Sequence, residues 1–200
     1  MTLKAIALNG TLKPKGASST DRMIATLGTA FAKHDVEIIE TIRLADHDIL
    51  PGVKSDEGKG DAWPAIREKI LAADILIFAG PIWMGQVSSV SKRALERMDA
   101  FLDETDDQGR MPSYSKVAIA AIVGNEDGAH HVSANVFQAL NDVGFTIPAV
   151  AACYWVGEAM GSKDYKDLDA TPRAVTKTAG MVATNAAHLA ALLKDNPYPG

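Results

Sequence analysis

The sequence predicts an α/β fold, a three-layer sandwich in which helices cover both faces of a five-stranded parallel sheet. Short apolar runs of strand length alternate along the chain with stretches of helical periodicity. This alternation is typical of βαβ units, whose crossover connections make neighbouring strands parallel. The chain has 200 residues, 47% of them hydrophobic and 22% charged, as in an ordinary globular protein. We therefore expect one domain over residues 1–200.

Each expected element follows from the spacing of apolar residues. The expected strands are residues 5–8, 36–42, 75–79, 117–123 and 147–153. The expected helices are 21–33, 63–73, 87–102, 129–143 and 171–193, and the apolar residues of the third recur on one helical face. Two connections are long, 44–61 and 154–170. Loops of that length are usually functional or mobile.

The composition of the strands predicts their order in the sheet. The first, third and fourth are nearly unbroken apolar runs, as expected where helices cover both faces. The second carries Glu37 and Glu40, and the fifth contains Pro148, which cannot donate a ladder hydrogen bond. The second and fifth strands therefore belong at the edges, which gives the order 2-1-3-4-5. In such a sheet, ligands bind beyond the carboxyl ends of the strands, where the strand order reverses.

The loop after the first strand is suited to a phosphate monoester. It combines glycine, lysine and hydroxyl side chains and leads into a helix, whose N-terminal amides and dipole favour an anion. The candidate phosphate ligands are Thr11, Lys13, Ser18, Ser19 and Thr20. A capping role for residues 18–21 explains only one or two of them.

Two familiar nucleotide-binding loops do not match this segment. The pattern G-x-x-x-x-G-K-[ST] fails because Lys15 occupies the second glycine position and Gly16 is followed by Ala17. The dinucleotide pattern G-x-G-x-x-G fails because Leu12 stands at its second glycine. Nucleotide hydrolysis and a standard dinucleotide fold are both disfavoured.

Two more loops are expected at the same edge of the sheet. Trp83 and Met84 follow the third strand in a turn framed by proline and glycine, where an aromatic side chain suits a flat ligand ring. The less favoured alternative is that Trp83 covers the sheet end or joins a subunit contact. After the fourth strand, residues 124–128 place polar side chains between glycines, either as a binding loop or as a plain loop in which Asp127 caps a helix. A phosphoacceptor receiver is disfavoured, because Asp74 precedes the third strand instead of ending it.

The sequence gives no positive sign of a metal, nucleic-acid or membrane site. His130 and His131 are neighbours, so on a helix they point in different directions and suit one ion poorly. Cys153 is the only cysteine and is expected to be an inert core thiol. The net charge is −5, from 20 basic and 25 acidic residues, unlike a general nucleic-acid binder. We expect a cytoplasmic protein, because no apolar run reaches the roughly 20 residues of a membrane span and no signal peptide is evident.

Together, the loops resemble those of the flavodoxin-like NAD(P)H-dependent FMN reductase and NAD(P)H:quinone oxidoreductase family. Residues 10–13 and 18–20 match its motifs G-S-x-R/K and S-[NST]-T, with threonine for serine at Thr11. Residues 81–85 match P-I-Y-W-G with the aromatic moved by one place, and Ser88, Lys92, Arg97 and Asp99 follow in register. The third loop is usually rich in glycine, and residues 125–127 depart from that.

The resemblance implies a flavodoxin-like fold and an FMN site. The phosphate would lie on the five ligands named above, and the isoalloxazine ring would lie against Pro81, Ile82, Trp83, Met84, Gly85 and Gln86, flanked by Gly124, Asn125, Glu126, Asp127 and Gly128. FMN would carry the chemistry, so no catalytic protein residue is implied. NADPH or NADH would supply electrons for a quinone, a flavin or a similar small acceptor.

The resemblance also implies a homodimer or homotetramer, and the apolar connection 154–170 would cover the flavin or pack against a second subunit. Two other functions stay open. A flavodoxin-type electron carrier is typically more acidic and has more than one stacking aromatic, whereas Trp83 is the one evident candidate here. A non-catalytic flavin-binding regulatory module is the third possibility, because of the unusual residues 125–127.

Overall fold

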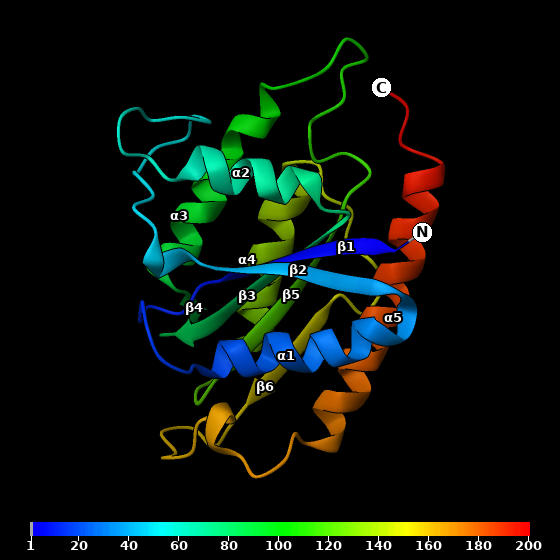
Figure 1. Cartoon of the computed structure of the whole chain (residues 1–200). Coiled ribbons are helices and arrows are strands. Elements are labelled where there is room, and N and C mark those ends of the chain that lie inside the picture. The colour runs from blue at the N-terminus through cyan, green and yellow to red at the C-terminus, as the bar shows by residue number, and fades with distance from the viewer. Residues whose placement is uncertain (1) are drawn as a thin grey trace.

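The computed structural model describes residues 2–200 and contains a parallel sheet of five long strands covered by helices (Figure 1). The sheet order is β2-β1-β3-β5-β6, with the short strand β4 paired antiparallel to β3. The strands are β1 (Leu3–Asn9), β2 (Val36–Arg43), β3 (Ile75–Trp83), β4 (Gln86–Val87), β5 (Val117–Gly124) and β6 (Ala152–Val156). Counting the five parallel strands alone, this is the predicted order 2-1-3-4-5, so the fold prediction is confirmed.

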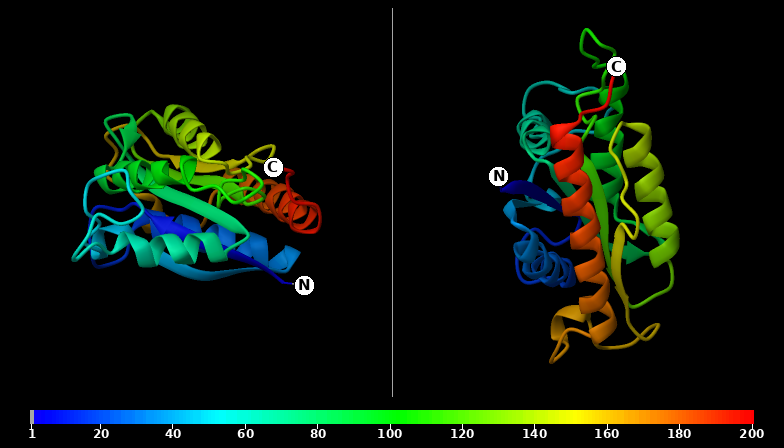
Figure 2. Two further views of the ribbon diagram at one scale, coloured as in Figure 1. Left: turned by 90° about the horizontal axis from the view of Figure 1, so that it is seen from above. Right: turned by 90° about the vertical axis from the view of Figure 1, so that its right-hand side faces the viewer.

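The helices form two layers, one on each face of the sheet (Figures 1 and 2). They are α1 (Ser19–Phe31), α2 (Trp63–Ala72), α3 (Ser89–Arg97), α4 (Ala129–Asp142) and α5 (Arg173–Asp195). Helices α1 and α5 pack on one face, and α2, α3 and α4 pack on the other. Alternate residues of β3 supply both cores: Ile75 and Ile77 face α1 and α5, and Phe78 faces the opposite layer. Burial on both faces explains why this strand reads as an unbroken apolar run.

The predicted fifth strand, residues 147–153, has the wrong bounds. The strand begins at Ala152 and continues through Tyr154 and Trp155, which were expected in a loop. Pro148 precedes the strand because it has no amide for the ladder, and Val150 has a positive φ of 55°, which interrupts an extended chain. The apolar residues of this edge therefore lie nearer the carboxyl end of the sheet than predicted.

The predicted helix 87–102 also begins too early. Gln86 and Val87 pair with Trp83 and Ile82 as β4, so α3 starts only at Ser89. The Ser88 hydroxyl accepts the amide of Ser91 at 3.3 Å and caps the helix. The third strand is longer than predicted, because residues 80–83 continue it to the hairpin.

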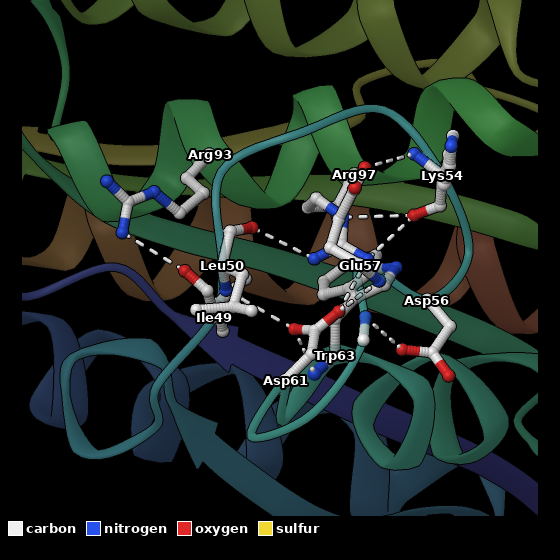
Figure 3. A network of polar contacts seen from close by, with 10 residues as sticks. Ile49, Leu50, Lys54, Asp56, Glu57, Asp61, Trp63, Arg93 and Arg97 are labelled. Atoms are coloured by element: carbon white, nitrogen blue, oxygen red, sulfur yellow. Dashed lines mark hydrogen bonds and ion pairs between the residues drawn. The ribbon is translucent and has the colours of Figure 1, made fainter.

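The long connection 44–61 is organised around one buried guanidinium, that of Arg97 (Figure 3). Arg97 donates from Nη1 to the carbonyl of Leu50 at 2.9 Å, and from Nε and Nη2 to that of Lys54 at 3.0 and 2.7 Å. Its Nη2 lies 2.8 Å from Oδ2 of Asp61, and both side chains are fully buried. These contacts with Arg97 therefore hold the long connection 44–61 in place, although it contains no strand.

The Asp61 carboxylate is the partner that makes burial of Arg97 tolerable. Burial alone raises the pKa of a carboxyl group. Here the hydrogen bond from Arg97 and those from the amides of Glu57, Trp63 and Leu50 outweigh burial and hold the pKa of Asp61 well below its usual range. Asp61 therefore stays ionised, and the pair is neutral as a whole.

Within residues 2–200, no helix is long and apolar enough to cross a membrane.

Asp61→Asn should be strongly destabilising, because it leaves the Arg97 charge buried without its counter-ion. We expect the free energy of unfolding in urea to fall by about 3–5 kcal/mol. Glu96→Gln is the matched control, since Glu96 pairs with Lys92 on the surface at 3.6 Å, and exposed pairs contribute about 0.3–0.5 kcal/mol. Equal effects of the two substitutions would contradict a central role for the buried pair.

The same carboxylate predicts how stability depends on pH. The pKa of Asp61 is lower in the folded chain than in the unfolded one. Its contribution is therefore complete at neutral pH and is lost as the pH falls below about 4, the ordinary value of aspartate. Urea unfolding of the wild type and of Asp61→Asn between neutral and acidic pH should show the difference between them shrinking on acidification. A constant difference would refute the assignment.

Candidate functional site

A pocket of about 430 Å³ lies at the carboxyl ends of the parallel strands, where the three predicted loops meet. Its lining includes eleven of the sixteen predicted site residues: Thr11, Lys13, Ser18, Ser19, Thr20, Pro81, Ile82, Trp83, Gly124, Asn125 and Glu126. These residues come from segments far apart in the sequence. The sheet topology therefore brings them together as the strand order predicted.

Five predicted site residues lie outside the lining: Met84, Gly85, Gln86, Asp127 and Gly128. Met84 and Gly85 form the β3–β4 turn with positive φ values of 51° and 72°, and the Met84 side chain is 89% exposed. Gln86 approaches His131, with Nε2 of each 3.0 Å apart. A Cβ atom at Gly128 would lie 2.9 Å from the Cα of Gly85, so glycine allows these two loops to touch.

The first loop is shaped by the carboxylate of Asp21. Oδ2 of Asp21 accepts the amide and the hydroxyl of Ser18 at 3.0 and 2.9 Å, and Oδ1 accepts Nδ2 of Asn9 at 2.6 Å. Arg43, the last residue of β2, pairs with the same carboxylate and donates from Nη1 to the carbonyls of Gly16 at 2.8 Å and Lys13 at 3.3 Å. The loop is therefore fastened to β1, β2 and α1 together.

Gly10 holds the first loop against the helix that follows the second. Its amide donates to the carbonyl of Ala79 at 2.7 Å, and its carbonyl accepts the hydroxyl of Ser88 at 2.6 Å. A Cβ atom at this position would lie 1.8 Å from Oγ of Ser91. Glycine is required here because the backbone of the first loop lies directly on the side chains of Ser88 and Ser91 at the start of α3.

Ser18 and Thr20 have different roles in this geometry. The Ser18 hydroxyl accepts the amide of Asp21 at 3.1 Å and completes a capping box, so the capping interpretation holds for this residue. Thr20 is only 1% exposed, and its Oγ1 has no hydrogen-bond partner among residues 2–200. A buried hydroxyl without a partner is costly, and this one lines a pocket at a helix N-terminus. The chemistry of this corner fits the phosphate of FMN.

The third loop connects the second loop to the segment after β6. Oε1 of Glu126 accepts the amide of Gly85 at 3.4 Å. Nδ2 of Asn125 donates to Oδ1 of Asp164 at 3.0 Å and to the carbonyl of Gly161 at 3.4 Å. The polar residues that depart from a glycine-rich loop thus bridge neighbouring segments.

Eight pocket residues were not predicted. Leu12, Ala17 and Val123 lie beside predicted residues, whereas Trp155, Met160, Gly161, Asp164 and Lys166 belong to β6 and the segment after it. Because the fifth strand was placed too early, the segment after it was not aligned with the ligand edge. The usable signal was the concentration of aromatic and methionine side chains in 154–170, from which we expected either a cover over the flavin or packing against a second subunit.

The remaining reactive side chains do not belong to the pocket lining. Nε2 of His130 lies 2.9 Å from Oη of Tyr154. In the part of the chain that the structure describes, no group of three or more His, Cys, Asp or Glu residues is arranged to hold a metal ion. Cys153 is buried, which raises the pKa of its thiol to about 12 and makes it unreactive at neutral pH.

A second hollow, of about 720 Å³, lies between α1 and α5 on the outer face of the molecule. Four of its threonines donate to main-chain carbonyls four residues earlier: Thr26 to Arg22 and Thr184 to Gly180 at 2.9 Å, Thr29 to Ala25 at 3.1 Å and Thr176 to Pro172 at 3.4 Å. These hydroxyl groups already donate their protons to the backbone, so they cannot donate them to a ligand. The pocket at the strand ends is therefore the candidate site.

Known proteins resemble this chain over most of its length. The family model described as NADPH-dependent FMN reductase matches residues 3–160. The chain is 34% identical over 209 aligned residues to an 8-demethyl-8-aminoriboflavin-5'-phosphate synthase of Streptomyces davaonensis, covering 99% of this chain and 81% of that protein. It is 38% identical over 170 residues to a protein of Mycobacterium bovis described as the divalent metal cation transporter MntH, covering 82% of this chain. The chain spans only 25% of that protein's length.

Solved structures agree in fold. RosB with a bound intermediate, 8-demethyl-8-formylriboflavin-5'-phosphate, superposes with a TM-score of 0.87 at 34% identity, covering 98% of this chain and 82% of that one. An archaeal flavodoxin gives a TM-score of 0.58 at 9% identity, covering 94% and 99% of the two chains, and shows the flavodoxin-like fold alone. The match over residues 3–160 and the 34% identity to a riboflavin-phosphate enzyme indicate FMN as cofactor and a nicotinamide nucleotide as co-substrate. This chain is therefore a flavoprotein enzyme that belongs to the NADPH-dependent FMN reductase family.

Proposed function

We propose that this enzyme passes reducing equivalents from NADPH or NADH through FMN to a small flat acceptor such as a quinone or a flavin. The observation that carries the proposal is a single pocket that joins a phosphate-binding corner to an apolar wall at the strand ends. When bound, FMN supplies the redox chemistry, while the protein supplies binding, orientation and electrostatics. The site therefore contains no protein nucleophile or base with a required catalytic role.

The phosphate corner is formed by the first loop and the start of α1. Thr20 offers its free hydroxyl, and Thr11, Lys13 and Ser19 line the same corner. The ammonium of Lys13 and the dipole of α1 both favour a dianionic phosphate. Ser18 acts by fixing the loop through its cap, with its hydroxyl committed to Asp21.

The ring would lie at the carboxyl ends of the neighbouring strands β3 and β5. Pro81, Ile82 and Trp83 supply one side, and Gly124, Asn125 and Glu126 supply the other. Trp83 is 50% exposed, so the ring region is open to a second flat molecule. We assign the five predicted residues outside the lining to shaping the turn and the third loop, without contact to the ring.

We also propose that the chain is one FMN-binding domain that assembles as a homodimer or homotetramer in the cytoplasm. Large apolar side chains stand exposed on the segments around the pocket, with Met84 89% and Met160 96% exposed. Exposed apolar groups of this kind are typical of surfaces that a partner covers. A cytoplasmic location would give access to reduced nicotinamide nucleotides.

A second candidate function takes FMN itself as the substrate. The Streptomyces davaonensis relative is a synthase of 8-demethyl-8-aminoriboflavin-5'-phosphate, and RosB holds an 8-formyl derivative. Both similarities extend over nearly the whole chain, including residues beyond the family match. Under this alternative, the same pocket would present the substituent at ring position 8 to a reactant.

Anaerobic mixing of the FMN-loaded protein with NADPH and with NADH should bleach the flavin absorbance. Turnover with a panel of a quinone, free flavin and an azo dye then identifies the acceptor class. A bound flavin that neither nucleotide reduces would support an electron carrier and contradict the reductase proposal. Mass spectrometry of the flavin recovered after turnover should give unmodified FMN, whereas a change in mass would support the second candidate.

Thr20→Val should weaken binding of FMN but not of riboflavin, which lacks the phosphate. A hydrogen bond to a charged group contributes about 1.5–3 kcal/mol, so we expect the dissociation constant of FMN to rise by at least about tenfold. Fluorescence titration of the flavin-free protein measures both ligands. Ser18→Ala is the comparison: it should cost about 1 kcal/mol of stability as a lost cap. Equal weakening of FMN and riboflavin by Thr20→Val would move the phosphate elsewhere.

A further inference from the structure

The pocket has a fourth wall, formed by the segment that follows β6. We call residues 157–168 the strap. Met160, Gly161, Asp164 and Lys166 of the strap line the pocket together with the three loops. The family match ends at residue 160, so most of the strap lies beyond the matched residues. Figure 1 shows this segment beyond the end of β6, near the N-terminal end of α1.

One end of the strap is fastened to α1 by Arg22. Nη1 of Arg22 donates to the carbonyls of Tyr165 at 2.9 Å, Leu168 at 2.5 Å and Lys166 at 3.2 Å. Its guanidinium lies 5.1 Å from the centre of the Tyr165 ring, which is itself fully buried. Hydrogen bonds from a charged donor are stronger than those from a neutral donor. The three hydrogen bonds from Arg22 therefore fix the backbone of this turn.

The anchored turn touches the phosphate corner directly. The amide of Lys166 donates to Oγ of Ser19 at 3.2 Å, and the side chain of Lys166 lines the same pocket as Lys13. Nζ of Lys166 is held between Asp164 at 3.0 Å and Asp167 at 2.7 Å. The tilted rings of Tyr165 and Trp155, 5.4 Å apart, connect this turn to the pocket wall on β6.

The other end of the strap is fastened to the third loop by Asn125. The amide nitrogen of Met160 donates to the carbonyl of Asn125 at 3.1 Å, while Nδ2 of Asn125 donates to Asp164 and Gly161 as described above. A Cβ atom at Gly157 would lie 2.6 Å from Oδ1 of Asn125. The strap therefore lies directly on the loop, with Asp164 bridging Asn125 and Lys166.

We propose that the strap is a fourth element of the FMN site and that Asn125, Asp164 and Arg22 are positioning residues that hold it against the pocket. The inference rests on the proposed FMN site and adds a segment to it. Asn125 fixes Asp164, Asp164 orients Lys166, and Arg22 fixes the backbone between them. Loss of this arrangement removes one wall of the pocket and the contact of the Lys166 amide with Ser19.

Asn125→Asp tests the Asn125–Asp164 contact by placing two carboxylates about 3 Å apart. The repulsion should displace the strap and raise the dissociation constant of FMN by at least about tenfold, measured by fluorescence titration of the flavin-free protein. Adding Asp164→Asn reverses the polarity of the pair and restores one donor and one acceptor, so the double variant should recover most of the affinity. Loss of a direct contact between Asn125 and the flavin ring would not be rescued in this way.

Matched variants complete the experiment. Arg22→Gln should also weaken FMN binding, whereas Arg173→Gln, at an exposed residue outside both the strap and the pocket lining, should bind normally. Hydrogen exchange of amides 157–168 should rise in Asn125→Asp and stay unchanged in Glu96→Gln. If Asn125→Asp fails to fold, Asn125→Gly, which removes the amide without adding charge, replaces it and should also weaken FMN binding.

The outcomes separate the two proposals. Wild-type affinity in Asn125→Asp, or a double variant no better than the single one, would overturn the role of the strap while leaving the FMN site standing. A wild-type protein that does not bind FMN would overturn the proposed function itself.

Discussion

The carboxylate of Asp21 is the interaction on which the shape of the site depends. It joins the end of β1 through Asn9, the end of β2 through Arg43 and the start of α1 through Ser18. A loop that binds phosphate must hold its amides and hydroxyls in place before the ligand arrives, because ordering them on binding would cost affinity. The Asp21 side chain orders the whole loop in this way, although its negative charge has the same sign as that of a phosphate ligand. Arg43 offsets that charge and also fixes two of the loop carbonyls.

The general architecture was predictable because a few physical constraints leave little choice. Strand composition separated edge from centre, and the carboxyl-end rule then brought loops from three strands to one pocket. What escaped prediction depends on particular backbone conformations. The positive φ of Val150 moved the fifth strand, and a hairpin of two residue pairs shortened the third helix. Neither has a periodic signal in the sequence.

Arg97 shows why matching a motif does not assign a role. It follows the motif of the second loop in register, yet its side chain lies among the carbonyls of Leu50 and Lys54 and against Asp61, away from the pocket. In this chain it fixes the connection 44–61 beside α3. Thr20 is the opposite case: sequence alone did not separate it from Ser18, and only the missing partner of its hydroxyl distinguishes the two.

The contact at Gly10 limits how this site can change by substitution. A side chain at this position would collide with Oγ of Ser91, so a larger residue here requires a smaller one at position 91. The contact between Gly10 and Ser88 adds a second tie between the same two segments. Single substitutions at the outer residues of each loop can then change the ligand preference. At the contact between Gly10 and the start of α3, by contrast, substitutions must occur in pairs.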